Sequence, residues 1–411
     1  MEVVHARCAG IDIAKKGAKV CVRVQGTRRR KTGYEVTDWG SMTDDILGLR
    51  QYLIDQQVTG VLMESTSDYW KPFYYLLEDA GFELILANAR HVKNIPGRKS
   101  DVNDATWLSD LCAHRLVRSS FVPPAPIRAL RDLTRSREVI THERTRKIAR
   151  LEKQLEDAGI KLSSVASNLS GVSCHDMLTA MVAGQRDPIA LSELARGSMR
   201  NKRPDLQRAL TGRFTEHHAF LVRMSLERIA QDDAAIAALT QRIEAQIEPF
   251  RSFRDLICAI PGISTTVADV IIAETGADMS VFPTAGHLAA WAGVAPGQNE
   301  SAGRTGSTTA RPGDSHLKGA LGIAAMSVSR TRNTRLGARY HRIAARRGKL
   351  KAIVAIERTL LSIVWAMGHT GQPYQEPGAD YYTRLRPDRT KTRALKMLRD
   401  LGYTVTLTPA A

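Results

Sequence analysis

The sequence predicts an α/β domain at its N-terminal end, followed by long helices and a mostly helical C-terminal part. Short apolar segments alternate with helical segments over residues 9–120, heptad-like apolar repeats follow, and residues 251–370 keep a helical periodicity. The chain has 411 residues, which suggests two to three domains, and 43% of them are hydrophobic, enough for a sizeable core. We expect units over residues 1–125, 126–250 and 251–370, and a basic tail over residues 371–411.

Three strands and a helix open the first domain. The apolar segments 9–14, 19–24 and 34–39 have the length and spacing of an antiparallel meander. A helix is expected over residues 43–56, because a threonine and two aspartates favour its positively polarised start.

Buried strands and helices alternate in the rest of this domain. Continuous apolar runs predict strands over residues 58–63 and 83–89. Helices are expected over residues 68–80, ending at Gly81, and over residues 102–117. The resulting order βββαβαβα resembles the RNase H-like fold of RuvC-type nucleases.

Two apolar seams predict long helices in the middle of the chain. The first runs through Ile148, Leu151, Leu155, Ala158 and Leu162, and the second through Ile229, Ile236, Ile243 and Phe250. Such seams make either an antiparallel hairpin or an intermolecular coiled coil. Residues 163–204 have weaker periodicity, and no element is assigned there.

The charge and the cysteines restrict the class of protein. Lys and Arg number 59 against 42 Asp and Glu, a net charge of +17, which suggests a polyanionic partner, most often nucleic acid. No apolar run reaches the roughly 18 residues of a membrane span, and no signal peptide is visible. The five cysteines lack CxxC spacing, which excludes a thiolate zinc site and fits a reducing cytosol. We expect no membrane partner and a cytoplasmic protein.

Four acids lie where the predicted fold would bring them together. Asp12 lies in the first strand, Glu64 ends the fourth, and Asp101 and Asp104 begin the last helix on one face. Converging carboxylates repel one another unless cations neutralise them, and hard oxygen ligands select Mg²⁺ or Mn²⁺. Two such ions can clamp the attacking and leaving oxygens of a phosphodiester.

Each acid alone also has a structural explanation. Asp101 and Asp104 would favour the helix dipole, and Glu64 would be a surface acid at a strand end. Asp12 is harder to explain in this way, because a carboxylate in an apolar strand costs several kcal/mol unless it is paired or metal-bound.

The C-terminal part contains a turn that resembles a helix-hairpin-helix. In Ile260-Pro261-Gly262-Ile263, backbone N–H groups at the following helix start would contact a phosphate without reading sequence. The alternative is an ordinary packing corner between two helices.

A polar, Gly-rich loop over residues 296–306 contains Ser301. Most loop serines only make turns, and a nucleophilic serine needs a base or a metal to activate it. No histidine is adjacent in the sequence, so activation would come from the carboxylate metal site.

A basic stripe follows. Residues 315–356 hold ten Lys or Arg and no acid, and four arginines share one helical face: Arg335, Arg339, Arg342 and Arg346. A charge run is usually a solvated face, but one this one-sided favours binding of a phosphate backbone. Further predicted nucleic-acid contacts are Arg28, Arg29, Arg30, Gly262 and Arg304.

Taken together, these residues resemble the DEDD-type transposases of the "one-ten" insertion-sequence family, which are bacterial mobile-element recombinases. The resemblance covers most of residues 8–370. It rests on the four acids and, in order, on IPGIS, AAWAGVAPGQNESAGRTG and RPGDSHLKGAL. Family members have small glycines after the serine, whereas here Ala302 precedes Gly303.

The resemblance implies a transposase in which Asp12, Glu64, Asp101 and Asp104 bind Mg²⁺ and Ser301 attacks DNA, giving a covalent phosphoserine. It further implies a non-coding bridge RNA that pairs with donor and target DNA, and a dimer or tetramer in which the acids of one subunit meet the serine domain of another. One alternative is a RuvC-like nuclease that uses metal-activated water. Another is a non-enzymatic nucleic-acid-binding protein.

Overall fold

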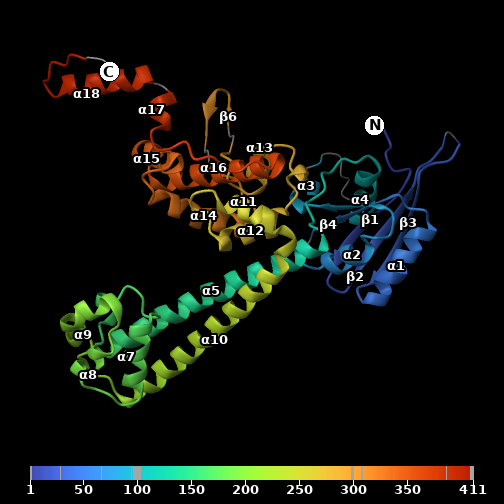
Figure 1. Ribbon diagram of the computed structural model, residues 1–411. Coiled ribbons are helices and arrows are strands. Elements are labelled where there is room, and N and C mark those ends of the chain that lie inside the picture. Colours follow the sequence, from blue (N-terminus) through green and yellow to red (C-terminus); the bar gives the residue numbers. More distant parts are fainter. Residues whose placement is uncertain are drawn as a thin grey trace. The chain divides into compact units, whose positions relative to one another are not determined.

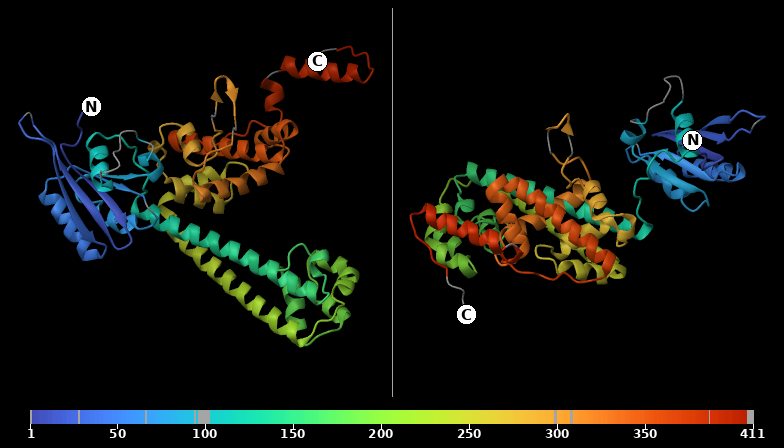
Figure 2. Two further views of the ribbon diagram at one scale, coloured as in Figure 1. Left: turned by 180° about the vertical axis from the view of Figure 1, so that it is seen from behind. Right: turned by 90° about the horizontal axis from the view of Figure 1, so that it is seen from above.

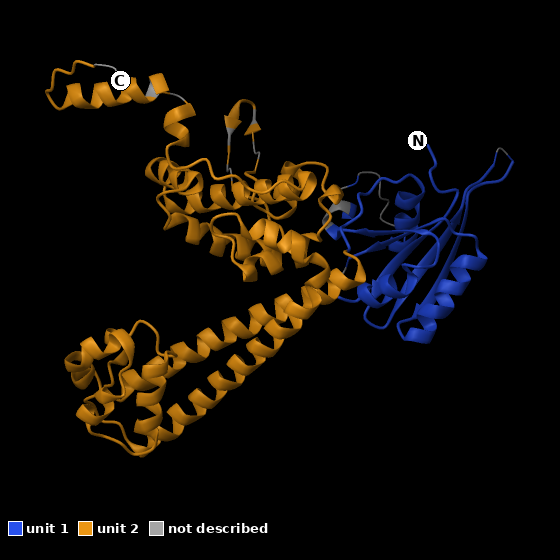
Figure 3. Ribbon diagram, viewed as in Figure 1, with its two compact units in different colours: residues 1–122 blue, residues 123–411 orange. Residues whose placement is uncertain are grey.

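A computed structural model describes residues 2–27, 29–65, 67–93, 95, 103–297, 300–306, 309–385 and 387–407. Figure 1 and Figure 2 show the chain from three directions. It divides into two compact units, residues 1–122 and 123–411 (Figure 3). The first boundary is close to the expected one at residue 125. The segments expected at 126–250, 251–370 and 371–411 lie together in the second unit.

The first unit is built on a five-stranded sheet of order β3-β2-β1-β4-β5. The strands are β1 (Arg7–Ala14), β2 (Gly17–Val24), β3 (Gly33–Gly40), β4 (Gly60–Glu64) and β5 (Glu83–Ala87). The first three pair antiparallel, whereas β4 is parallel to both β1 and β5. This confirms the meander and its parallel extension, and the mixed sheet is compatible with an α/β fold of the RNase H-like type.

Helices cover both faces of this sheet (Figure 1). They are α1 (Thr43–Asp55), α2 (Trp70–Leu77), α3 (Ala89–Lys93) and α4 (Asp104–Ala113). Alternate strand residues such as Ile11 and Met63 pack with α1 and α2, and those between them, such as Leu62, pack with α4. Among the described elements of this unit, the sequence pattern did not predict the short helix α3.

A long helical hairpin begins the second unit. Helices α5 (Ala125–Asp157) and α10 (Glu216–Gln246) pack along each other, as the view from behind in Figure 2 shows. Arg144 pairs with Asp233 near the middle of the two helices, and Asp157 pairs with His218 near the tip, so the helices run antiparallel. The structure therefore resolves the alternatives for the seams in favour of an intramolecular hairpin.

Five short helices cap the tip of the hairpin, over most of the stretch for which the sequence predicts no element. They are α6 (Leu162–Val165), α7 (Val172–Val182), α8 (Pro188–Glu193), η1 (Gly197–Lys202) and α9 (Arg203–Ala209). Their apolar residues, including Met177 and Leu206, form one core with Leu151, Leu155 and Ile229 of the hairpin. Apart from α7, each of these helices has at most seven residues and is too short to show a clear period, which explains why the pattern missed them.

The apolar helix α16 (Lys349–Thr370) is at the centre of the C-terminal helices, and its buried residues include Leu360 and Val364. The others are η2 (Glu248–Phe250), α11 (Arg251–Cys258), α12 (Thr265–Thr275), η3 (Met279–Val281), α13 (Ala285–Trp291), α14 (Ser315–Ser329), α15 (Arg335–Arg347), α17 (Tyr381–Leu385) and α18 (Pro387–Asp400). Helix α16 packs against α11, η3, α13, α14 and α15. No helix in the described part of the chain combines the length and the apolar character of a membrane span.

A buried ion-pair network fastens the base of the hairpin to these helices. The Glu274 carboxylate on α12 is fully buried and accepts two hydrogen bonds of 2.8 Å from Arg135 on α5. One turn away, Arg137 of α5 lies 3.2 Å from Asp269 of α12, and Arg254 of α11 approaches the same carboxylate at 3.5 Å. Burial raises the pKa of both carboxyl groups, but the arginines oppose that shift.

Candidate active site and nucleic-acid interface

Two of the predicted acids lie in adjacent parallel strands. The last matched pair of β1 and β4 is Ile11 and Met63, and each is followed directly by an acid, Asp12 and Glu64. By strand alternation both acids lie on the face that packs against α4, the face of Leu62. Both are half-buried. The register therefore places Asp12 and Glu64 in neighbouring positions of adjacent strands, at the edge of the sheet where the sequence predicts them.

Gly10 brings the start of α4 to the same edge. A Cβ added at Gly10 would lie 2.2 Å from the Ala105 carbonyl oxygen and 2.4 Å from the Ser109 nitrogen. Only glycine therefore lets β1 and the first two turns of α4 touch through their backbones. Asp104 is the first residue of that helix and is exposed.

The fourth predicted acid, Asp101, lies outside the described residues. Among residues that are described, no three His, Cys, Asp or Glu side chains gather closely enough to hold a metal ion. The structure thus brings Asp12, Glu64 and the start of α4 to one edge of the sheet. A complete four-acid metal centre stays a prediction.

Two side chains that the sequence reasoning missed fix the orientation of α4. The Arg23 guanidinium on β2 and the Tyr34 hydroxyl on β3 both donate to Asp110 Oδ1 of α4, each at 2.9 Å. Burial, and then the bond to the Asp110 carboxylate, raise the pKa of Tyr34. The sequence contained one signal, because Arg23 is a charged residue within the apolar strand VCVRV.

Ser301 lies in the first strand of a small hairpin, β6 (Glu300–Ser301) with β7 (Arg304–Thr305). Ser301 pairs with Arg304, and the two turn residues Ala302 and Gly303 have φ values of 49° and 74°. A two-residue turn with both φ angles positive is the type that suits the twist of a hairpin. The backbone of Ser301 thus directly precedes an exposed hairpin tip, and its side chain lies outside the described part of the structure.

The base of the loop that carries this hairpin is closed by two glycines. A Cβ on Gly293 would lie 2.7 Å from the Gly313 nitrogen, and a Cβ on Gly313 would lie 2.2 Å from the Gly293 nitrogen. Next to them, the Asp314 carboxylate accepts from the Leu317 N–H at 2.7 Å and caps α14, and it also lies 3.5 Å from Arg135 of the buried network. The motif RPGDSHL is therefore explained as the closure of this loop.

Two models of transposases match separate parts of the chain. Residues 9–160 match a DEDD-type transposase model of IS110 elements, and residues 254–341 match the model described as transposase IS116/IS110/IS902 family. The chain belongs to the IS110 family of transposases. It is accordingly an enzyme that cuts and rejoins DNA, which favours the catalytic hypotheses over a binding-only protein.

Relatives from mobile elements agree with this assignment. The transposase is 26% identical over 320 residues to the "Insertion element IS900 uncharacterized 42 kDa protein" of Mycobacterium paratuberculosis, which spans 71% of this chain and 78% of the relative. It is 29% identical over 160 residues to the "Insertion element IS110 uncharacterized 43.6 kDa protein" of Streptomyces coelicolor, which spans 36% of this chain and 37% of that relative.

The helix-hairpin-helix-like turn of the transposase is packed against α14. Gly262 has a φ of 94°, and a Cβ there would lie 2.7 Å from Val328 Cγ2 and 2.8 Å from the Ala324 carbonyl oxygen. These contacts explain the glycine as part of a packing corner. The following helix start is open to solvent, because Ser264 and Thr265 are exposed, so a phosphate contact there stays a prediction.

The predicted basic contacts occupy several exposed places. Arg29 and Arg30 are exposed beside the tip between β2 and β3, Arg304 is exposed on β7, and Arg28 lies outside the described residues. The stripe on α15 is confirmed as one helix, with Arg335 and Arg339 half-buried and Arg342 and Arg346 exposed.

Aromatic residues of α17 hold two of the α15 arginines. The Arg335 guanidinium lies 4.9 Å from the ring centre of Tyr381, and that of Arg342 lies 4.7 Å from the ring centre of Tyr382. The helix start is fixed by the Glu376 carboxylate, which accepts from the Arg335 N–H at 2.7 Å. The stripe is therefore oriented by the segment that follows α16.

Proposed function

We propose that this transposase breaks and rejoins DNA by transesterification, with Ser301 as nucleophile and with Mg²⁺, or Mn²⁺, held by Asp12, Glu64, Asp101 and Asp104. The observation that carries the metal site is the edge of the sheet where Asp12 and Glu64 are adjacent and where Gly10 admits the start of α4. Carboxylates are the hard oxygen donors that these ions prefer, so the residues fit the group. When bound, the ions would neutralise the acids and polarise the scissile phosphate.

The covalent step follows from the chemistry of a serine. The Ser301 Oγ loses its proton and forms a bond to phosphorus, while the bond from phosphorus to the DNA sugar oxygen breaks and that oxygen leaves as an alcohol. Rejoining reverses the exchange with a new sugar hydroxyl. Because one phosphodiester replaces another, the reaction needs no nucleotide hydrolysis. The exposed tip formed by Ala302 and Gly303 supports access of DNA to this segment.

The two halves of the proposed chemistry belong to different compact units, because the acids lie within residues 1–122 and Ser301 lies within residues 123–411. We infer that the working enzyme is a dimer or tetramer in which one copy supplies the acids and another the serine. The net charge of +17 supports the binding of a further nucleic acid in addition to the target DNA. A bridge RNA that pairs with donor and target DNA is part of this proposal.

Activity measurements with single variants test the chemistry. Recombination of cognate DNA, with the guide RNA and Mg²⁺, is expected to be lost in Ser301→Ala and Asp12→Asn. Two matched controls are expected to keep it: Thr305→Val changes a hydroxyl in the same hairpin, and Asp38→Asn changes an acid of the same sheet that pairs with Lys19. DNA cleavage that survives in Ser301→Ala but not in Asp12→Asn would instead favour water as the nucleophile.

Mixing the two inactive variants tests the shared site. If one copy supplies the acids and another the serine, an equal mixture of Asp12→Asn and Ser301→Ala regains part of the recombination activity. If each copy works alone, the mixture stays as inactive as either variant.

A further inference from the structure

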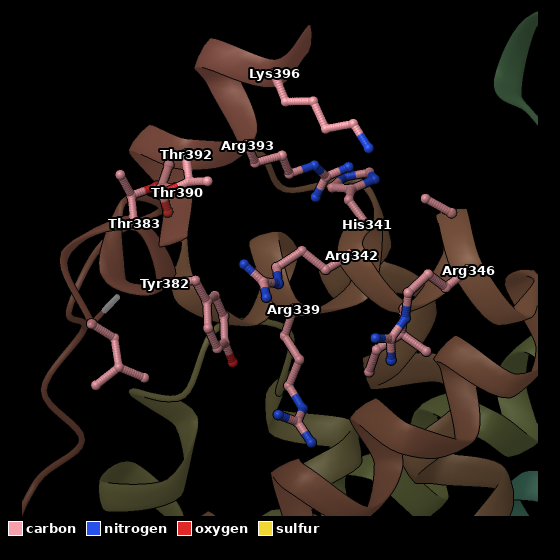
Figure 4. Close-up of a pocket in the computed structure, with 13 residues that line it drawn as sticks. Arg339, His341, Arg342, Arg346, Tyr382, Thr383, Thr390, Thr392, Arg393 and Lys396 are labelled. Carbon is pink, nitrogen blue, oxygen red and sulfur yellow. The ribbon is translucent and has the colours of Figure 1, made fainter. Parts of the chain in front are cut away.

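A basic groove lies among α15, α17 and α18 (Figure 4). Its volume is about 1330 Å³. Three of its cations come from α15 and two from α18, and the ring of Tyr382 on α17 lies to one side, next to Arg342. The cations are Arg339, Arg342, Arg346, Arg393 and Lys396. The second transposase match ends at residue 341, and helices α17 and α18 begin after it. The side of the groove formed by α17 and α18 is therefore outside the region that matches that model.

The described part of the protein does not neutralise the charges of the groove. Among the described residues that line it there is no aspartate or glutamate. Within the described part of the chain, none of its five cations takes part in an ion pair. Five cations held around one cavity repel one another, so an anionic ligand with several charges would stabilise the arrangement.

We propose that this groove binds a single strand of nucleic acid. The volume exceeds the roughly 300–1,000 Å³ of ordinary small-molecule pockets, which points to a segment of a polymer. A positively charged groove combined with an aromatic face is the arrangement that holds a strand by its phosphates and stacks one of its bases. Tyr382 supplies that face, and Arg342 lies 4.7 Å from its ring centre.

This inference deepens the proposed function, because it assigns a place where the enzyme holds RNA or displaced DNA. Binding can be measured without catalysis, so failure of the groove and failure of the serine chemistry are distinguishable. A single strand of DNA and one of RNA share the same phosphates and bases, and the two are compared as separate probes.

The decisive variant removes the two α18 cations, Arg393→Ala with Lys396→Ala, in the full chain. The matched control removes two cations that are exposed on the same helix and do not line the groove, Lys391→Ala with Arg399→Ala. Labelled single-stranded RNA, single-stranded DNA and duplex DNA are titrated at several salt concentrations. We expect the groove variant to bind a single strand about tenfold more weakly. Its salt slope should fall by roughly 1.4, which corresponds to two lost phosphate contacts.

Equal single-strand affinity of the two double variants would overturn the proposal, and a loss confined to duplex DNA would overturn the assignment to a single strand. The aromatic face is tested by Tyr382→Leu, with Tyr381→Leu as control, because Tyr381 also holds an arginine but does not line the groove. We expect Tyr382→Leu to weaken single-strand binding by roughly fivefold or more and Tyr381→Leu to leave it near the wild-type value. Equal effects of the two changes would exclude stacking.

Discussion

Replacing Gly10 by alanine should separate α4 from β1. The added Cβ would meet the Ala105 carbonyl oxygen at 2.2 Å, whereas an ordinary contact begins at 3.4 Å, so the helix start must move by roughly 1 Å. Because the atoms it meets belong to the backbone, no side-chain rotation relieves the clash. Overpacking of this kind costs about 1–3 kcal/mol of folding free energy.

The same shift would displace Asp104 relative to Asp12 and Glu64. A misplacement near 1 Å can lower an enzymatic rate by about 100-fold. We expect Gly10→Ala to lower the recombination rate by about the same factor. We also expect it to raise the Mg²⁺ concentration needed for half-maximal activity, an effect that a loss of stability alone would not produce. The control is Gly33→Ala in β3, where a Cβ meets nothing within 4 Å. If Gly10→Ala matched Gly33→Ala in melting temperature, rate and Mg²⁺ dependence, the reasoning about this edge of the sheet would be refuted.

Three further changes test other parts of the structure. Arg23→Met removes a buried donor to Asp110, and should lower the free energy of unfolding by about 2 kcal/mol, measured by denaturant titration. Ala302→Gly removes the cost of a positive φ at a residue with a side chain, about 1–2 kcal/mol, and should slow hydrogen exchange in the hairpin; faster exchange would contradict the turn geometry. Burial raises the pKa of the Glu357 carboxyl, and Lys318 only partly opposes this. A raised folded-state pKa gives stability that is present below the unfolded value near pH 4.3 and lost as the pH rises through the folded value. Melting temperatures should therefore fall from pH 4 to pH 7 more in wild type than in Glu357→Gln, and an equal fall in both would contradict it.

Much of the sheet was predictable because its signals are local. The continuous apolar run before Glu64 is typical of a buried strand, and strands flanked by helices imply parallel neighbours. That reasoning placed Asp12 and Glu64 at one edge, as the register shows. The two long helices were also predictable, since an apolar seam every seven residues extends over many turns, but the seams did not decide between a hairpin and an intermolecular coiled coil.

Contacts between distant parts of the sequence were not predictable. Arg23 donates a hydrogen bond to Asp110, which is 87 residues away in the sequence. Gly293 contacts Gly313 and closes a loop, and no local sequence pattern predicts this contact. Gly262 was interpreted as a phosphate contact because its motif is local, whereas its neighbour Val328 becomes visible only in three dimensions. The acids of the proposed site could therefore be predicted from the sequence, whereas the contacts that position them could not.

The position of the covalent link to DNA tests the central claim most directly. The wild-type protein is incubated with cognate DNA, guide RNA and Mg²⁺, denatured and digested, and the peptide that carries DNA is identified by mass spectrometry. The account predicts a phosphodiester on Ser301, formed only when the divalent ion is present. A link to another residue, or active recombination without any protein-bound DNA, would contradict it.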